Sequence, residues 1–339
     1  MTRVLVTGAS GFVGGHLVEA LVRRDYDVRC LVRQTSKLKH LPVDDLELVH
    51  GDLLDFEAVD RAVAGCDVVY HCAGAIAVLK SQDFAIVNVD GTSNIVRACL
   101  RQPHPPVLVL VSSVSAAGPA QLDRPRTEDD PPRPMSFYGR SKRGGEEVAE
   151  AAAGRLPLTI VRPGIVFGPR DRELFAAIDC IWRTYAHILP RRKTPPLSFI
   201  EVSDLAQLLI TAGERGRRVP PPGDKEPGTG DGYYFATNGE FPTYREFGHI
   251  AARALGRRRA IIIAPPPPIP WTMALASEAI SRFRQRPVTF CRDKFYEAIV
   301  ESWACSNQRA CEQLAFTPTG TFADQMRRAI EWYRAEGWI

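Results

Sequence analysis

A glycine-rich turn directly after the first apolar run is the feature that most constrains the fold of this 339-residue chain. The run covers residues 4–7 and is followed by Gly8, Gly11 and Gly14. Glycines at this spacing let the backbone turn sharply, approach a pyrophosphate closely and pack a helix against the preceding strand. Amide groups at the start of that helix, with the positive end of its dipole, suit phosphate oxygens. The turn predicts a dinucleotide site, provided that it lies in a strand-helix-strand unit.

The first half of the chain has the pattern of such units. Short apolar runs alternate with helical patterns at intervals of roughly 20–30 residues, which is typical of a parallel sheet covered on both faces. We expect strands at residues 4–7, 28–32, 46–50, 68–71, 107–112 and 158–162, and helices at residues 12–23, 55–64, 90–101 and 136–153. The prediction is an α/β fold with a doubly wound parallel sheet of the Rossmann type.

The pattern loosens after Gly168. Helical stretches lie near residues 172–186, 203–214, 243–255 and 321–335, with a short strand-like piece at 233–236. A chain of this length usually exceeds a single hydrophobic core. We therefore expect a dinucleotide-binding domain at residues 1–168. Residues 169–339 should form mainly a smaller mixed α/β lobe that binds substrate, with some segments returning to the Rossmann sheet.

Charge and cysteine usage exclude several classes of protein. The 43 basic and 39 acidic side chains leave a net charge of +4, too weak for a nucleic-acid-binding protein, so no nucleic-acid partner is expected. The eight cysteines contain no C-x-x-C pair, and His71 beside Cys72 has no second ligand pair at zinc spacing, so no metal site is expected. Free cysteines and the lack of a secretory pattern near Met1 indicate a cytoplasmic protein.

Residues 260–277 are uncharged and raise the question of a membrane. Five prolines in this stretch preclude a regular spanning helix. The simplest interpretation is a buried strand at 260–264, a polyproline segment and the start of a helix. The alternative is an apolar surface that contacts a membrane or a lipid substrate, which would make the protein membrane-associated.

The residue that follows the second strand bears on the choice of cofactor. A carboxylate there would bond a free ribose 2′-hydroxyl and repel a 2′-phosphate. Here the position is Arg33, which can pair with a 2′-phosphate and stack on adenine. We expect NADP(H), with NAD(H) as the alternative.

Three side chains at the carboxyl end of the sheet suggest the chemistry. Tyr138 and Lys142 are four residues apart on an expected helix and share one face, and Ser112 and Ser113 end the fifth strand. Tyr138 would exchange a proton with a carbonyl or alcohol oxygen, while Lys142 would favour the phenolate and hold the nicotinamide ribose. Ser113 would hydrogen-bond the reacting oxygen for hydride transfer.

Taken together, these motifs resemble the extended branch of the short-chain dehydrogenase/reductase superfamily, the NAD-dependent epimerase/dehydratase family. The resemblance runs through nearly the whole chain and is carried by residues 7–14, 51–53, 71–74, 88–92, Ser112 and Ser113 with Gly118, Tyr138 with Lys142, and residues 162–169 and 202–206. It implies a cofactor site made of Gly8, Ser10, Gly11, Phe12, Val13, Arg33, Asp52, Leu53, Ala73, Gly74, Asn88, Ser112, Tyr138, Lys142, Pro163, Gly164, Ile165 and Val166. In that family the pair at 52 and 53 contacts the adenine, and residues 163–166 pack near the nicotinamide.

Within the superfamily the chain looks most like the 3β-hydroxysteroid dehydrogenase/dihydroflavonol reductase group. Sugar-nucleotide members carry an Arg-Asp pair where this chain has Leu197 and Ser198, and often an Asn at Ile165. An apolar pocket rim is expected from Ile76, Val78, Leu79, Phe137, Phe167, Phe175 and Trp182. The prediction is a dehydrogenase or reductase that interconverts a secondary alcohol and a ketone on an apolar, steroid-like or flavonoid-like substrate.

Two other functions stay open. Arg191, Arg192 and Lys193 could hold a phosphate, which would suit a nucleotide-sugar epimerase or dehydratase. A non-catalytic NADP-sensing scaffold would keep the fold without turnover, although such proteins typically lose the Tyr or the Lys. The resemblance also implies a homodimer through a four-helix bundle formed by residues 90–101 and 136–153 of each subunit.

Overall fold

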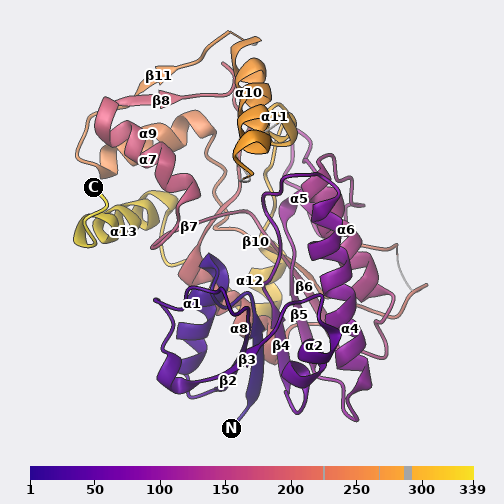
Figure 1. Ribbon diagram of the computed structural model, residues 1–339. Helices are drawn as coiled ribbons and strands as arrows, with labels where there is room; N and C mark the ends of the chain where they lie inside the picture. The colour runs from indigo at the N-terminus through magenta and orange to yellow at the C-terminus, as the bar shows by residue number, and fades with distance from the viewer. Residues whose placement is uncertain (224–225, 267, 286–291) are drawn as a thin grey trace.

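A seven-stranded parallel sheet forms the centre of the larger half of the protein (Figure 1). The computed structural model describes residues 1–223, 226–266, 268–285 and 292–339. The strands lie in the order β10-β6-β5-β4-β1-β2-β3, and every neighbouring pair is parallel. Their bounds are β1 Arg3–Thr7, β2 Asp27–Val32, β3 Leu46–His50, β4 Val68–His71, β5 Val107–Val111, β6 Leu158–Pro163 and β10 Tyr233–Ala236. The predicted doubly wound sheet is confirmed.

Helices cover both faces of this sheet. One face packs against α1 (Phe12–Val22), α8 (Val202–Arg215) and α12 (Gln308–Leu314), and the other against α2 (Phe56–Val63), α4 (Gly91–Arg101) and α6 (Phe137–Glu150). Strands covered on both faces must be apolar at every position, as in β5, whose sequence is VLVLV. The strand β10 and the helices α8 and α12, all late in the sequence, lie with this sheet.

The helical segment that contains the helix predicted at residues 90–101 begins earlier than its sequence pattern indicates. Helix α3 (Asp83–Ala85) runs through a single π-helical turn at Ile86–Asp90 into α4. Such a turn inserts an extra residue and often occurs beside functional sites. Here it carries Asn88, which is buried.

A second lobe lies beyond the carboxyl ends of the strands (Figure 1). Its elements are the short helix α5 (Val114–Ala117), β7 (Ile165–Phe167), α7 (Glu173–Thr184), β8 (Ala186–Ile188), β9 (Phe199–Glu201), α9 (Tyr244–Ala254), β11 (Ile261–Ile263), α10 (Pro268–Arg284), α11 (Arg292–Ala298) and α13 (Phe322–Ala335). Its core is an aromatic cluster in which Phe167 and Phe199 pack against Phe322, with ring centroids 5.2 and 4.6 Å apart. The lobe therefore has a hydrophobic core separate from those of the sheet.

The expectation of a buried strand after Ala260 was wrong. Residues 261–263 do form β11, but Ile261 is 61% exposed and Ile263 46%. The reason is that β11 pairs only with β8 in a two-stranded sheet at the surface, where nothing among the described residues covers its outer side. The predicted helix follows at Pro268, because proline is tolerated in a first helical turn. Pro267 lies outside the described residues, and no described helix is long and apolar enough to cross a membrane.

Candidate active site

A cavity of about 1310 Å³ opens at the carboxyl ends of the central strands. The sheet contributes the glycine turn, the end of β5, the start of α6 and residues 163–166. The second lobe contributes residues of α7, the segment after β8, α10 and α11. Ligands in open α/β sheets bind at this edge, so the cavity is the candidate site.

The glycine turn has the geometry that a dinucleotide requires. Gly8 has a φ of 72°, and a Cβ there would lie 2.7 Å from the backbone nitrogen of Ala73. A Cβ on Gly14 would lie 2.2 Å from the carbonyl oxygen of Gly8, so only glycine fits. Helix α1 follows Gly11 with no capping side chain among the described residues, which leaves its first amides free to hold a phosphate. The residues present therefore fit a bound dinucleotide.

A buried histidine fixes the loop that faces the glycine turn. The ring of His71 lies between two hydroxyls, with Nδ1 2.7 Å from Thr7 Oγ1 and Nε2 3.1 Å from Thr92 Oγ1. Burial lowers the pKa of His71 to about 3, so the ring is neutral. The backbone amide of Ala73 donates to the same Thr7 hydroxyl. His71 is thus a packed, hydrogen-bonded residue rather than a catalyst, as its place at the end of an apolar strand indicates.

Asn88 also holds this loop in place, through hydrogen bonds to the backbone of Ala75. Its Oδ1 accepts from the backbone amide of Ala75 at 2.8 Å, and its Nδ2 donates to the carbonyl of Ala75 and to Ser141 Oγ. The side chain is fully engaged and does not line the cavity. Asn88 therefore positions the loop at Gly74 against helix α6.

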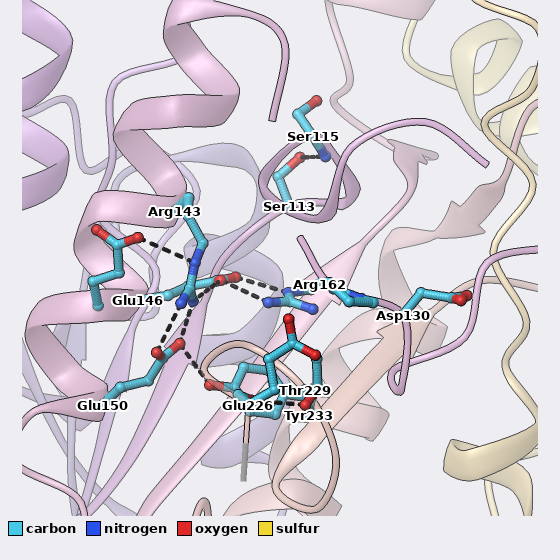
Figure 2. A network of polar contacts seen from close by, with 12 residues as sticks. Ser113, Ser115, Asp130, Arg143, Glu146, Glu150, Arg162, Glu226, Thr229 and Tyr233 are labelled. Carbon is cyan, nitrogen blue, oxygen red and sulfur yellow. Dashed lines mark hydrogen bonds and ion pairs between the residues drawn. The ribbon is translucent and has the colours of Figure 1, made fainter. Parts of the chain in front are cut away.

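The three residues predicted to carry the chemistry all line the cavity. Tyr138 stands in the first turn of α6, which Ser136 caps by accepting from the amide of Gly139 at 2.8 Å. Ser113 caps α5, its Oγ accepting from the amide of Ser115 at 3.1 Å (Figure 2). Burial raises the pKa of Tyr138, while the charge of Lys294 and a hydrogen bond with Ser113 oppose the rise.

Lys142 is hydrogen-bonded to the end of strand β5. Its ammonium donates to the carbonyl oxygen of Val111 at 2.7 Å, and burial lowers its pKa to about 8. The cation that lies over the Tyr138 ring is Lys294 of α11, with Nζ 4.9 Å from the ring centroid. Sequence reasoning missed Lys294, because nothing in the local pattern of α11 indicates that it packs against α6.

A buried ion-pair network holds helix α6 against strand β6 (Figure 2). Arg162 donates through two nitrogens to the carboxylate of Glu146, at 2.9 and 2.7 Å, and both side chains are fully buried. Arg143 also bonds to Glu146 at 2.9 Å and pairs with Glu150, to which Tyr233 donates at 2.5 Å. Because Glu146 lies one helical turn beyond Lys142, the network fixes the position from which α6 presents Tyr138 and Lys142 to the cavity.

A comparison with protein-family models identifies the family of the chain. Residues 4–225 match the model of the NAD dependent epimerase/dehydratase family. The chain belongs to this family. It is the extended branch of the short-chain dehydrogenases/reductases, and its members are NAD-dependent enzymes.

Relatives span both reductive and epimerising activities. A ceramide reductase of Caulobacter vibrioides is 30% identical over 99% of this chain and 96% of its own length. A 3-beta-hydroxysteroid dehydrogenase of Mycolicibacterium neoaurum is 30% identical over 76% of this chain and 71% of its own length. Among solved structures, the UDP-glucose 4-epimerase of Thermus thermophilus in complex with NAD is 25% identical with a TM-score of 0.74, over 98% of this chain and 99% of its own.

The remaining residues that the family resemblance predicted for the cofactor fall into two groups. Those that line the cavity are Gly8, Ser10, Gly11, Phe12, Val13, Gly74, Ser112, Pro163, Gly164, Ile165 and Val166. Those that lie outside its wall are Arg33, Asp52, Leu53 and Ala73. The cavity wall also includes Lys37, Lys39 and His40, which sequence reasoning missed although the run of basic residues after β2 was a usable signal.

The apolar pocket rim was mostly wrong. Of the seven predicted residues only Ile76 lines the cavity; Val78, Leu79, Phe137, Phe167, Phe175 and Trp182 do not. Phe167 is buried in the core of the second lobe, and Phe175 packs on Tyr333. The apolar wall comes instead from segments whose approach depends on tertiary packing: Leu174, Ile188, Leu189, Pro190, Leu197, Pro265, Pro270, Met273 and Trp303.

Two further residues have structural roles. Helix α8 is capped by Glu201, whose carboxylate accepts from the amides of Ser203 and Asp204. Asp204 orients a loop, accepting from the amide of Thr319 and from Gln325.

The basic triplet that kept a phosphate site open lies outside the cavity wall. Arg191 donates to the backbone carbonyls of Lys193 and Ile299, and the carbonyl of Arg192 accepts from Arg245. None of the three basic residues faces the cavity. A diphosphate bound in the cavity would not be held by this triplet.

Proposed function

We propose that the protein is an NAD(P)-dependent oxidoreductase that interconverts a secondary alcohol and a ketone on an apolar substrate. The observation that carries this proposal is the convergence of Tyr138, Ser113 and Lys142 on one cavity whose outer wall is apolar. A bound nicotinamide dinucleotide would supply or accept the hydride. The geometry of the glycine turn supports its binding.

Each catalytic side chain has a distinct part in the reaction. Ser113 hydrogen-bonds the reacting oxygen and holds the carbon that carries it in one orientation. Tyr138 gives its phenolic proton to the carbonyl oxygen in reduction, and its phenolate removes the alcohol proton in oxidation. Lys142 places a positive charge in the cavity wall and would hold a ribose hydroxyl of the cofactor.

The preferred cofactor on this proposal is NADP(H). Lys37, Lys39 and His40 line the cavity on the segment that follows β2, and Arg33 is exposed just before them. A 2′-phosphate carries two negative charges and would gain charge-assisted hydrogen bonds if these side chains held it. NAD(H) lacks this phosphate and would gain none of them.

An apolar substrate is favoured by the wall of the second lobe. Ile188, Leu189, Met273 and Trp303 face the cavity beyond the catalytic residues. Relatives named for a ceramide and for a 3β-hydroxysteroid are consistent with such a substrate. The alternative, a nucleotide-sugar epimerase, is favoured by the overall similarity to the UDP-glucose 4-epimerase structure.

One assay separates these functions. The purified protein is supplied with NADPH or NADH and a panel of steroid ketones, long-chain 3-keto lipids and UDP-glucose, with the Tyr138→Phe variant as control. Net oxidation of NADPH with an apolar ketone, lost in the variant, supports the proposal. Conversion of UDP-glucose to its epimer without net cofactor consumption would replace it by the epimerase. Binding of NADPH without turnover on the whole panel would favour the sensor.

We also propose that the outer surface of the second lobe rests on an anionic lipid bilayer. Exposed apolar side chains gather on β8, β11 and α10, including Ile188, Ile261, Trp271, Met273 and Phe283, the last 91% exposed. Ile188 and Met273 also line the cavity, so this surface is continuous with its mouth. Such a surface would let a lipid substrate pass between bilayer and cavity.

Charge favours a bilayer over a second copy of the chain. Residues 256–299 contain eight basic and three acidic side chains. All three acids are engaged: Glu278 pairs with Arg292, Glu297 pairs with Lys294, and Asp293 accepts backbone hydrogen bonds from α6. The uncompensated charge is positive, which attracts anionic headgroups and repels an identical surface.

Vesicle flotation tests this contact. The protein should float with vesicles that contain phosphatidylserine and much less with pure phosphatidylcholine. Phe283→Glu should abolish flotation, whereas Leu122→Glu, an exposed apolar residue elsewhere, should not. Flotation equal for both lipids and both variants, or self-association lost in Phe283→Glu alone, would overturn the proposal.

A further inference from the structure

Helix α11 docks on the first turn of α6, the turn that carries Tyr138. Asp293 accepts from the backbone amides of Phe137 and Tyr138, at 2.8 and 3.2 Å. Glu297 accepts from Ser136 Oγ at 2.6 Å. Acidic side chains at the start of a helix are stabilised by its dipole. The two helices, more than a hundred residues apart in sequence, therefore meet at a defined position.

This docking places a second lysine in the catalytic cavity. Lys294 lines the cavity, with Nζ 4.9 Å from the centroid of the Tyr138 ring. Its ammonium donates to Glu297 Oε2 at 2.9 Å, one turn further along α11. Glu297 thus contacts both Ser136 at the start of α6 and the ammonium of Lys294. These contacts restrict the rotamers of Lys294 and fix the position of its ammonium.

The other charges around Tyr138 do not fill this role. Glu297 of α11 and Glu173 of α7 both raise the pKa of the phenol, as does burial. Lys142 of α6 is engaged with the carbonyl of Val111. Ser113, at the start of α5, offers a neutral hydrogen bond, and the Phe84 ring of α3 packs 5.8 Å away without charge. Of the groups that lower the pKa of Tyr138, Lys294 has the largest effect.

We propose that Lys294 is a positioning residue that acts through Tyr138: held by Glu297, its ammonium sets positive charge at the phenol ring and stabilises the phenolate during proton exchange. The second lobe thereby contributes to the chemistry as well as to substrate binding. Since α11 belongs to that lobe, Tyr138 has its full reactivity only when α11 is docked. The kinetic part of this inference rests on the proposed oxidoreductase function, and its electrostatic part does not.

The test compares Lys294→Met, which keeps most of the side-chain length, with Lys294→Arg, which keeps the charge. Arg292→Met is the matched control, because Arg292 lies on the same helix and pairs with Glu278 away from Tyr138. In the oxidative direction kcat/KM needs the phenolate, so its pH profile has an acid limb. We expect Lys294→Met to move this limb to higher pH by about one unit. In Lys294→Arg and Arg292→Met the acid limb should stay within a few tenths of a pH unit of its position in the wild type.

A spectroscopic measurement keeps the inference separate from the activity. The tyrosinate absorbance of Tyr138 is obtained as the difference between each protein and its Tyr138→Phe counterpart during an alkaline titration. Its midpoint should rise in Lys294→Met and stay in place in Lys294→Arg. If the wild type turns over no substrate, the proposed function fails while this midpoint still tests Lys294. Should Lys294→Met fail to fold, Lys294→Gln serves in its place.

Some outcomes would overturn the inference. An unchanged midpoint and an unchanged acid limb in Lys294→Met would show that the lysine does not act on the phenol. A uniform loss of activity across the pH range, shared by Arg292→Met, would mean that α11 has only a structural part.

Discussion

The ammonium of Lys142 hydrogen-bonds to the carbonyl oxygen of Val111, the last residue of β5, at 2.7 Å. Lys142 is thus bound to the carboxyl end of a central strand and not to the phenol of Tyr138. The carboxyl end of β5 also leads into Ser112 and Ser113, so this bond joins the serine and lysine parts of the site. It lies in a buried place where a positive charge is costly.

The pKa of Lys142 predicts that this residue destabilises the fold at neutral pH. Below pH 8 the folded and the unfolded chain both carry its proton, and the folded chain bears the cost of burying it. Between about pH 8 and 10.5 the folded chain loses the proton first, so stability attributable to this residue rises with pH. Lys142→Met should therefore raise the free energy of unfolding at pH 7 by on the order of 2 kcal/mol, while abolishing activity.

Urea unfolding at pH 7 and at pH 10.5 measures this difference. The gain of Lys142→Met over the wild type should shrink towards the higher pH. A variant that is less stable than the wild type at pH 7 would contradict the prediction, because the hydrogen bond to Val111 would then outweigh the cost of burial.

The ion pair of Arg162 and Glu146 predicts a contrast between two adjacent glutamates. Burial would raise the pKa of Glu146, but Arg162 and Arg143 outweigh it and hold the pKa below its ordinary value. Glu146→Gln leaves the fully buried Arg162 without a carboxylate and should cost about 3–5 kcal/mol. Glu147 is 62% exposed and pairs with Arg143 at 3.4 Å, so Glu147→Gln should cost less than about 1 kcal/mol. Equal effects in thermal unfolding would refute the structural role of the network.

Lys39 should distinguish the two nicotinamide cofactors. Lys39→Gln is expected to weaken NADPH binding by about tenfold and to change NADH binding by less than about twofold, because only NADPH has a 2′-phosphate to pair with the ammonium. Lys80→Gln, at an exposed position outside the cavity wall, is the control. Fluorescence titration gives both affinities. A parallel loss for the two cofactors would argue against the NADP(H) preference.

The homodimer expected from the family resemblance stays a prediction. Helices α4 and α6 lie side by side on one face of the sheet, as a four-helix bundle between two subunits would require (Figure 1). Light scattering at micromolar concentration should give twice the chain mass of 37.5 kDa. Arg140→Glu on the exposed side of α6 should halve that mass, whereas Arg23→Glu at the end of α1 should not. A monomeric wild type would contradict the expectation.

The sheet and the glycine turn could be predicted because their signals are local. Apolar runs such as residues 107–111 indicate buried parallel strands when they alternate with helices. The tight turn between β1 and α1 requires glycine at positions 8 and 14 for steric reasons. The pair Tyr138 and Lys142 could be found because a helix brings residues four apart onto one face.

The substrate side of the cavity could not be predicted in this way. Lys294 approaches Tyr138 only because Asp293 and Glu297 dock α11 on α6, and no periodicity encodes a contact over such a separation. Phe167 has the same apolar character as a pocket residue, yet it is buried in the core of the second lobe. Strand β11 is exposed because no described element packs on its outer side. The sequence of three isoleucines does not indicate whether another element will cover them.

A label-transfer experiment tests hydride transfer assisted by Tyr138 most directly. The protein is incubated with an apolar ketone and NADPH that carries deuterium on the transferable position of its nicotinamide ring, and the product is analysed by mass spectrometry. Deuterium is expected on the carbinol carbon of the alcohol, with the rate falling at least about a hundredfold in Tyr138→Phe while NADPH affinity changes less than about twofold. Product without deuterium, or equal rates for wild type and variant, would contradict hydride transfer assisted by Tyr138.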